Sequence, residues 1–283
     1  MESAARILRE TGHDAILAPT TGPAMAGDMA RQSIAEGAEM IIAAGGDGTI
    51  NEVIEGMVNS PVPLGILPAG TANVLANETG MSTSLEKAAR ALADYRPQQI
   101  ALGLLQATGT AAPRHFLLMA GVGLDARIVY NVSAGLKSKV GKLAYWAAAM
   151  TLVGRRLEEF DVKIEGAVHR CSFALISRVR NYGGDFEIAC RTGLMDDRFE
   201  VVLFQGHSSW RYLRYFTAVA LKRLDGMQGV TVLRARDVCI AASADPRVHV
   251  QVDGEYAGRL PASIEIVPDA LTVLLPPGYL QRR

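Results

Sequence analysis

The sequence predicts two domains of different class: an α/β domain with a parallel sheet over residues 1–103 and an antiparallel β-sandwich over residues 104–283. Helical and strand-like patterns alternate in the first part, which is typical of helices packed on a parallel sheet. After Leu102, segments rich in β-branched and aromatic residues follow one another with turn residues between them, which favours a sandwich or barrel. A length of 283 residues also suits two modest domains.

The first domain begins with two helical patterns, over residues 1–11 and 26–38. The run Met40–Ala44 is short and continuously apolar, as expected of a buried parallel strand. Apolar residues then recur at helical spacing from Ile50 to Val58, and prolines end this helix. Leu64–Leu67 is the next short strand, and another helical pattern follows its loop. The alternation indicates parallel strands joined by helical crossovers.

The second domain contains a series of strand-like segments and two helical insertions. The strand-like segments are Phe116–Ala120, Asp161–Ile164, Ser172–Ile176, Phe199–Phe204, Gly229–Leu233, Val248–Val252, Ser263–Val267 and Leu271–Leu274. The helical insertions are Gly141–Arg156 and Ser209–Leu224. Because turn residues separate most of the segments, we expect the strands to be antiparallel.

Composition excludes several classes of function. Lys+Arg and Asp+Glu both total 29, so the basic excess of a nucleic-acid binder is absent. The three cysteines lie far apart, which favours a reducing compartment over a disulfide framework. The longest uncharged apolar run, Leu143–Val153, is too short to span a bilayer, and the N-terminus lacks the pattern of a signal peptide. We therefore expect a cytoplasmic protein that binds no nucleic acid and meets a membrane only from its surface.

The stretch AAGGDGTINEV, residues 43–53, places three glycines and an aspartate between a predicted strand and a predicted helix. Glycines at such a turn allow positive φ and the close approach of a ligand. Backbone amides of the loop and of the helix N-terminus favour an anion, and phosphate is the natural candidate. We call residues 45–51 the glycine-rich turn. Its candidate ligand-binding residues are Gly45, Gly46, Asp47, Gly48, Thr49, Ile50 and Asn51.

Asp47 needs a separate explanation, because a carboxylate repels a neighbouring phosphate. A Mg²⁺ ion between the two groups, or an acceptor hydroxyl facing Asp47, would make the pair compatible. The alternative for the whole turn is structural: the glycines would then only let the helix pack closely on the sheet.

A second loop, Leu67–Asn73 with the sequence LPAGTAN, follows the next strand and opens the next helix. Because the carboxyl ends of parallel strands meet at the same edge of a sheet, we expect the two loops to lie close together. Gly70, Thr71 and Asn73 would then face the other side of a nucleotide. Neither loop contains a lysine, and no GxxxxGK[ST] motif occurs, which excludes a P-loop. The GxGxxA match at residues 121–126 is followed by strand-rich sequence rather than by the βαβ unit of a dinucleotide site.

The stretches GGDGTINEV and LGILPAGTANVLANE resemble the diacylglycerol kinase catalytic domain family, which includes bacterial diacylglycerol kinases and the sphingosine and ceramide kinases. Further segments are similar to this family and occur in the same order. They are FLLMAGVGLDARIV, YGGDFEIA (Tyr182–Ala189), GLMDDRFEVVLF, VDGEYAG (Val252–Gly258) and IEIVPDALTVLLP. The resemblance therefore spans nearly the whole chain.

The resemblance implies a NAD kinase-like α/β nucleotide domain, a C-terminal β-sandwich and an active site in the cleft between them. It also implies an ATP-dependent lipid kinase that transfers the γ-phosphoryl group to a diacylglycerol-like hydroxyl, with ATP and Mg²⁺ as cofactors. The nucleotide would contact the glycine-rich turn, Gly70 and Thr71, together with Thr20 or, as a second choice, Thr21.

The DGE motif would supply the catalytic base of such a kinase. Here that residue is Glu255, with Asp253 as its partner or rival. Asp47 is the candidate catalytic residue of the other domain. The chemistry is reasonable, because a carboxylate within hydrogen-bond reach can take the proton of an attacking alcohol. Positioning and charge neutralisation account for the rest of a phosphoryl transfer.

Bacterial members of the family carry a structural Mg²⁺ around a DDG stretch. The matching residues are Leu194 and Phe199, through backbone carbonyls, and the side chain of Asp197. Arg198 replaces the glycine of this stretch, where a positive φ would be strained. Arg178 stands at about the position of an asparagine that usually precedes the YGG turn. The chain also starts at the helix that follows the family's first strand and NPxxG-like loop, so it is expected to lack both.

A kinase with a lipid substrate must contact a bilayer, so the expected partner is a lipid presented at the inner membrane face; a homodimer is one possible assembly. Helix Ser209–Leu224 and the run Leu143–Val153 combine apolar and basic residues, and the alternative for each is packing within its own domain. Two other functions stay open. One is NAD kinase, which shares GGDGT but has an NxGxLGF-like segment where this chain has GTANVLANETG. The other is a catalytically impaired nucleotide- or lipid-binding homologue.

Overall fold

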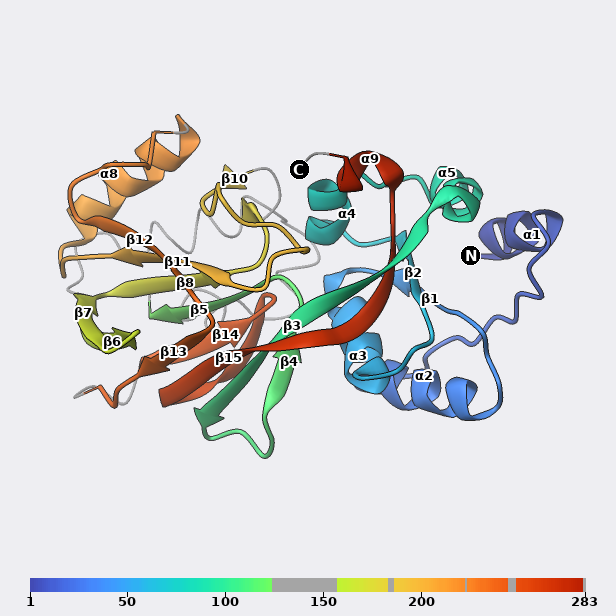
Figure 1. Cartoon of the computed structure of the whole chain (residues 1–283), viewed down its shortest axis with the longest axis horizontal. Helices are drawn as coiled ribbons and strands as arrows, with labels where there is room; N and C mark the ends of the chain where they lie inside the picture. The colour runs from blue at the N-terminus through green and yellow to red at the C-terminus, as the bar shows by residue number, and fades with distance from the viewer. Residues whose placement is uncertain (124–156, 183–185, 222, 244–247, 282–283) are drawn as a thin grey trace. The chain divides into compact units, whose positions relative to one another are not determined.

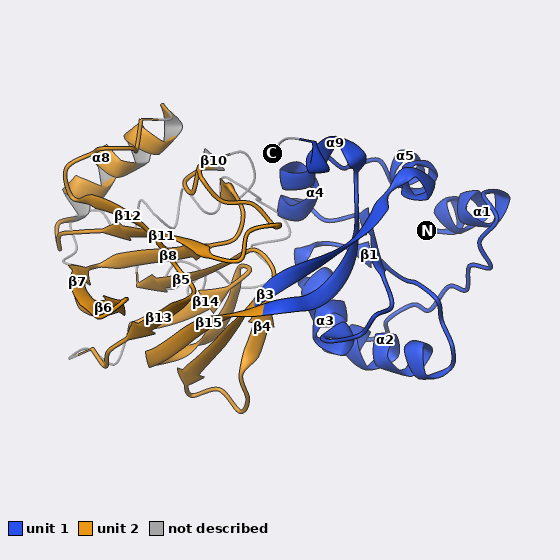
Figure 2. Ribbon diagram, in the orientation of Figure 1, with its two compact units in different colours: residues 1–102, 268–283 blue, residues 103–267 orange. Residues whose placement is uncertain are grey.

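The structure is a computed structural model that describes every residue except 124–156, 183–185, 222, 244–247 and 282–283 (Figure 1). The chain forms two compact units (Figure 2). Unit 1 comprises Met1–Leu102 and Pro268–Arg283, and unit 2 comprises Gly103–Val267. Two long strands, β3 (Arg96–Thr108) and β15 (Glu255–Leu275), continue from one unit into the other. The expected helix Gly141–Arg156 and the run Leu143–Val153 lie outside the described residues.

Unit 1 contains the parallel sheet that the sequence predicts. β1 (Ile41–Gly45) pairs in parallel with β2 (Leu64–Pro68) along the full length of both strands. The end of β15 also pairs in parallel with β2, through Val273, so β2 lies between β1 and β15. Residues from Pro268 onward therefore group with unit 1, whereas the sequence analysis assigned them to the second domain. The physical reason is that the apolar run Leu271–Leu274 completes this sheet.

The helices of unit 1 pack in pairs. They are α1 (Glu2–Glu10), α2 (Ala26–Ala35), α3 (Asp47–Met57), α4 (Val74–Thr79), α5 (Leu85–Ala91), the 3-10 turn Leu92–Asp94 and α9 (Pro277–Leu280). α1 packs against α5, and α2 packs against α3. A Cβ atom on Gly56 of α3 would lie 2.0 Å from the carbonyl oxygen of Gly27 in α2, so this approach requires glycine. The segment between α1 and α2 joins no strand, and Ile16 within it is 87% exposed.

Unit 2 is built on antiparallel strands in the order β12-β11-β8-β5-β14-β15-β13-β6-β7. Their bounds are β5 (Met119–Gly123), β6 (Phe160–Ile164), β7 (Ala167–Cys171), β8 (Phe173–Ser177), β11 (Phe199–Phe204), β12 (Val230–Ala235), β13 (Asp237–Ile240) and β14 (His249–Val252). Outside this path, β4 (Arg114–Phe116) pairs with β3, and β9 (Asn181–Tyr182) pairs with β10 (Phe186–Glu187).

Unit 2 has a single main core, to which strands from distant places on this path contribute. Phe116, Phe160 and Phe199 come from β4, β6 and β11, and all three are buried in one cluster. The rings of Phe116 and Phe199 stack with their centroids 5.8 Å apart. The strand path therefore folds over on itself around the core, as in the predicted sandwich.

Two expected elements of unit 2 differ in detail. The segment Phe116–Ala120 is not one strand, because the backbone between β4 and β5 turns its amides toward the side chain of Asp253. The helix expected at Ser209–Leu224 is α8 (Ser209–Ala220). It packs within unit 2 through Tyr212 and Tyr215, whose rings lie against Phe204. Within the described part of the chain, the model contains no helix that combines the length and the apolar character of a membrane span.

Candidate active site

The glycine-rich turn joins β1 to α3, and the helix starts at Asp47, three residues earlier than the periodicity suggests. Gly46 caps the helix in an extended conformation, with φ −87° and ψ 178°, and offers no side-chain cap. The first-turn amides of an α-helix lack intrahelical acceptors, so the amides that follow Gly46 are oriented to bind an anion. This is the feature that the phosphate hypothesis requires.

The glycines of the turn serve close packing, not positive φ. Gly45, Gly46, Gly48 and Gly70 are all absent from the glycines with positive φ, which corrects the conformational part of the prediction. A Cβ atom on Gly70 would lie 2.5 Å from the Cα of Gly46, and one on Gly45 would lie 2.7 Å from the Cβ of Thr49. Any side chain at these positions would push the two loops apart.

The two loops of unit 1 lie side by side, as the sequence analysis predicts. The amide of Ala69 donates to the carbonyl oxygen of Gly45 at 2.8 Å, directly after the paired ends of β1 and β2. In the second loop, Asn73 has a left-handed backbone, and its side chain both accepts from the Gly70 amide and donates to the Gly70 carbonyl, each at 2.9 Å. Asn73 therefore shapes the loop from inside, while Thr71 is exposed to solvent.

Asp47 connects the two loops. Its Oδ1 accepts a hydrogen bond from the amide of Val74 at 3.0 Å, at the N-terminus of α4. Desolvation raises the pKa of Asp47 from its ordinary value of 3.8, and the amides of Leu75, Val74 and Asn73 oppose that rise. The carboxylate thus has a structural role that sequence reasoning missed, because Asp47 and Val74 are 27 residues apart.

The remaining nucleotide candidates of unit 1 differ in exposure. Ile50 and Asn51 are buried on the inner side of α3, so their side chains hold the helix in place. Thr20 and Thr21 are exposed in the segment between α1 and α2. Within the described residues, no hydrogen bond is recorded between Thr20 and either loop, and its contact with a nucleotide stays a prediction.

The DGE motif forms a tight turn between β14 and β15 in unit 2. Val252 and Glu255 are paired, and both residues between them have positive φ, 48° at Asp253 and 81° at Gly254. This is the conformation of a type I′ hairpin turn, for which Asp-Gly is a favoured sequence. The Gly254 amide donates to Oε1 of Gln251 at 2.7 Å and fixes the turn further.

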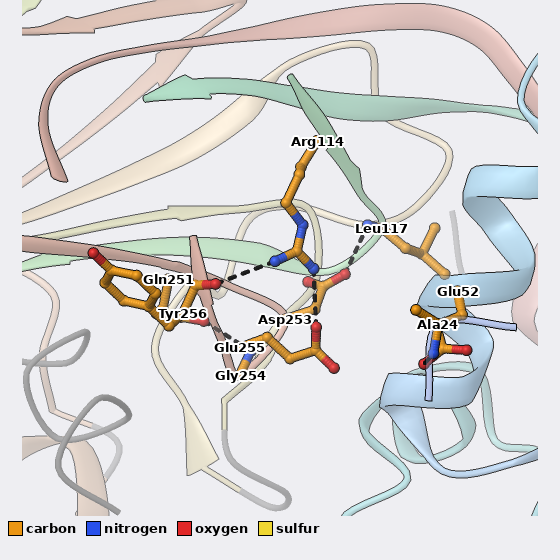
Figure 3. A network of polar contacts seen from close by, with 9 residues as sticks. All are labelled: Ala24, Glu52, Arg114, Leu117, Gln251, Asp253, Gly254, Glu255 and Tyr256. Atoms are coloured by element: carbon orange, nitrogen blue, oxygen red, sulfur yellow. Dashed lines mark hydrogen bonds and ion pairs between the residues drawn. The ribbon is translucent and has the colours of Figure 1, made fainter. Parts of the chain in front are cut away.

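The carboxylate of Asp253 accepts three backbone hydrogen bonds, of which Figure 3 draws the one from Leu117. The amide of Leu117 donates to Oδ2 at 2.9 Å, and the amides of Leu118 and Met119 donate to Oδ1 at 3.0 and 2.7 Å. Its own amide donates to the Met119 carbonyl at 2.9 Å. A carboxylate held in this way fixes the turn against the segment that leads into β5, and a part for Asp253 beside Glu255 as the base stays a prediction.

Glu255 is the acid of this turn that remains accessible, with a side chain 45% exposed. Arg114 Nη2 lies 2.9 Å from Oε2 of Glu255, and Arg114 Nη1 donates to the carbonyl oxygen of Tyr256 at 3.2 Å (Figure 3). Arg114 therefore holds both the side chain of Glu255 and the backbone of the next residue. The sequence analysis did not identify Arg114, because it is 141 residues from Glu255 and reaches it only through the neighbouring strands β4, β3 and β15.

Two of the three groups expected to bind a structural Mg²⁺, the carbonyl of Leu194 and the carboxylate of Asp197, have other partners in this structure. The carbonyl oxygen of Leu194 accepts a hydrogen bond from Nη2 of Arg178 at 2.7 Å. Asp197 is exposed and forms an ion pair with Arg236, which holds the pKa of Asp197 below its ordinary value. Phe199, expected to contribute its backbone carbonyl, is the first residue of β11 and pairs with Ala235 of β12.

A cavity of about 650 Å³ lies elsewhere in unit 2. Its lining includes His169, Arg170 and Arg211, and neither Asp253 nor Glu255 contributes to it. It is therefore separate from the carboxylates that carry the proposed chemistry.

Comparisons with known proteins agree with the two-part architecture. Residues 1–105 match the model of the family described as "Diacylglycerol kinase catalytic domain". Residues 119–275 match the family described as "YegS C-terminal NAD kinase beta sandwich-like domain". Fold and turns together thus define a kinase-like chain in which an α/β catalytic domain is joined to a β-sandwich.

Curated relatives are similar over most of the chain. A diacylglycerol kinase of Mycobacterium tuberculosis (strain ATCC 25618 / H37Rv) is 29% identical over 249 residues, which cover 86% of this chain and 79% of the relative. A diacylglycerol kinase of Bacillus subtilis (strain 168) is 27% identical over 274 residues, covering 94% and 88%. A solved structure of a diacylglycerol kinase from Bacillus anthracis str. Sterne has the same fold, with a TM-score of 0.73, 20% identity and coverage of 92% and 85%. The chain belongs to the diacylglycerol kinase catalytic domain family, with the YegS-type β-sandwich as its second domain.

Proposed function

We propose that this protein is an ATP-dependent lipid kinase that transfers the γ-phosphoryl group of ATP to the hydroxyl of a diacylglycerol-like lipid. The observation that carries the proposal is the distinct state of Glu255 beside Asp253. Asp253 is saturated by backbone amides, whereas Glu255 is half-exposed and held by Arg114. A positioned, accessible carboxylate is what a general base needs. The relatives named diacylglycerol kinase supply the acceptor class.

Unit 1 supplies the phosphate-binding part of the proposal. The amides after Gly46 donate hydrogen bonds to the triphosphate. The exposed Thr71 and Thr20 provide hydroxyl contacts to the nucleotide. A Mg²⁺ ion bound together with ATP would neutralise phosphate charge. Asp47 is the acid of the turn that would face this ion.

The proposed transfer needs only the lipid hydroxyl, ATP and Glu255. The lipid hydroxyl oxygen forms a bond to the γ-phosphorus, the bond from that phosphorus to the β–γ bridging oxygen breaks, and ADP leaves. The hydroxyl proton passes to Glu255, whose orientation depends on the guanidinium of Arg114. The acceptor carries acyl chains, so we propose that the enzyme works from the cytoplasm at the inner membrane face, where α8 presents the exposed Arg211 and Arg214.

The proposal is tested by incubating the protein with γ-labelled ATP, Mg²⁺ and mixed micelles of diacylglycerol, with sphingosine and NAD in parallel. We expect label on diacylglycerol, and its loss in Asp47→Asn and Glu255→Gln while both variants stay folded. Arg114→Lys keeps the positive charge but cannot contact both Glu255 and the Tyr256 carbonyl. It should lower transfer less, on the order of tenfold. Label on NAD would identify a NAD kinase. Nucleotide binding without transfer by the wild type would identify an impaired homologue, and either result would overturn the proposal.

A further inference from the structure

Arg178 is fully buried, with 0% exposure, at the end of β8 in unit 2. Its Nη2 donates to the carbonyl oxygen of Leu194 at 2.7 Å, and its Nη1 donates to the carbonyl oxygen of Asp196 at 3.3 Å. Burying a charged guanidinium is unfavourable unless polar groups surround it. The loop 194–196 therefore turns its carbonyl dipoles toward a positive charge that the protein itself provides.

The same loop is where the family resemblance implies a structural Mg²⁺. Carbonyl oxygens are the ligands that such an ion uses, at about 2.0–2.1 Å for Mg²⁺. An ion that close to the Leu194 oxygen would lie within a few ångströms of the Arg178 guanidinium, and two like charges repel strongly in a buried site. The carbonyl cannot serve both cations.

The expected side-chain ligand, Asp197, is also committed elsewhere, and so is the neighbouring carboxylate of Asp196. The carboxylate of Asp197 faces Arg236, and that of Asp196 accepts from the Gly193 amide at 3.0 Å and lies 3.2 Å from Arg234. Arg198, which replaces the glycine of the DDG stretch, does not take a positive φ. The backbone carbonyls of the loop thus bind the guanidinium of Arg178, and its carboxylates pair with other arginines.

We propose that the guanidinium of Arg178 occupies the place of the structural metal ion, so that unit 2 of this protein is stable without a divalent cation. Its role is to tie loop 194–196 to β8. The Arg178 amide donates to the carbonyl oxygen of Leu118 at 2.8 Å, and Leu118 is one of the residues that Asp253 holds. Arg178 therefore links the loop to the segment that supports the DGE turn.

The first test uses the full-length wild type without nucleotide. Protein purified with Mg²⁺ and Ca²⁺ in every buffer is dialysed, analysed for metal content, and unfolded thermally with EDTA, with Mg²⁺ and with Ca²⁺. We expect less than stoichiometric metal and the same unfolding midpoint in all three conditions. A stoichiometric divalent ion whose removal lowers the midpoint would overturn the proposal. This outcome is independent of any variant and of kinase activity.

The second test asks whether removal of the internal cation opens a metal site. Arg178→Asn frees the carbonyl of Leu194, and we expect a midpoint about 5 °C or more below the wild type in EDTA, with a rise when Mg²⁺ or Ca²⁺ is added. Arg180→Asn is the matched control, because Arg180 is an exposed arginine two residues away that also donates to a loop carbonyl, that of Thr192. It should show no metal response. If Arg178→Asn folds but its unfolding midpoint does not respond to metal, the guanidinium does not occupy the place of an ion. If Arg178→Asn fails to fold, Arg178→Lys is used instead. A change of its midpoint with EDTA would equally contradict the proposal.

Discussion

The glycine-rich turn of unit 1 and the DGE turn of unit 2 use aspartate in the same way. Asp47 binds the amide of Val74 at the start of α4, and Asp253 binds the amides that precede β5. In both turns a carboxylate fixes a second segment of backbone through hydrogen bonds. They differ in what else they offer: unit 1 has a helix N-terminus without a side-chain cap, and unit 2 has the second acid, Glu255.

This difference assigns separate tasks to residues that look alike in the sequence. The carboxylate of Asp253, which accepts three backbone hydrogen bonds, contributes to stability. An accessible carboxylate contributes little to stability and remains available for chemistry. Substitutions in the two turns should therefore separate into those that change the free energy of unfolding and those that change turnover.

The largest effect is expected for Glu255→Gln. The amide side chain keeps the size of glutamate but cannot take a proton, so phosphoryl transfer should fall by roughly 10²–10⁴-fold. The ion pair with Arg114 is partly exposed, and its loss should change the free energy of unfolding by less than about 1 kcal/mol. Initial rates with diacylglycerol micelles and urea unfolding measure the two quantities. Wild-type turnover in this variant would remove Glu255 from the chemistry.

Asp253→Ala should show the opposite behaviour. Three buried amides lose their acceptor, and we expect a loss of about 3 kcal/mol in the free energy of unfolding. Asp269→Ala is the matched control, because Asp269 has nearly the same positive φ, 49°, but is exposed. Urea denaturation of both variants separates the backbone strain that they share from the hydrogen bonds that only Asp253 makes. Equal losses in the two variants would show that the amide contacts add nothing.

Gly70→Ala tests the close approach of the two loops in unit 1. The new methyl group would meet the Cα of Gly46 at 2.5 Å, and we expect a loss of about 1–3 kcal/mol together with weaker nucleotide binding. Gly278→Ala is the control, since a Cβ atom there meets nothing within 4 Å. Thermal unfolding and titration with an ATP analogue measure both effects. A Gly70→Ala protein as stable as Gly278→Ala would show that the loops can separate without loss.

The smallest effect concerns the stability contribution of Asp47. Asp47→Ala removes the acceptor for the Val74 amide and should cost about 1 kcal/mol, whereas Asp47→Asn keeps an acceptor. Because the folded-state pKa of Asp47 is raised, its contribution to stability is present below pH 3.8 and is lost as pH rises through the raised value. The stability of Asp47→Asn relative to wild type should therefore increase from pH 4 to pH 7. A relative stability that falls over this range would contradict the sign of the shift.

Much of the fold follows from local sequence. Apolar runs give β1 and β2 to within a residue, and the prolines after Val58 mark the break before β2. The β-branched and aromatic residues of Phe199–Phe204 predict β11 with the same bounds. β7 and β13 were missed, because short strands with polar residues such as His169 and Asp237 lack a clear apolar signal. The sequence analysis also placed Leu271–Leu274 in the second domain, whereas the segment groups with unit 1 because it pairs with β2.

The sequence alone determined the two loops of unit 1, the DGE turn and the family, because each rests on neighbouring residues whose backbone preferences are local. Only the tertiary structure decided which acid is accessible, which arginine orients it, and that Arg178 binds the carbonyl of Leu194. These contacts join residues 16 to 141 positions apart. Their existence depends on strand order and burial, and side-chain charge acquires its role only when packing fixes the groups around it.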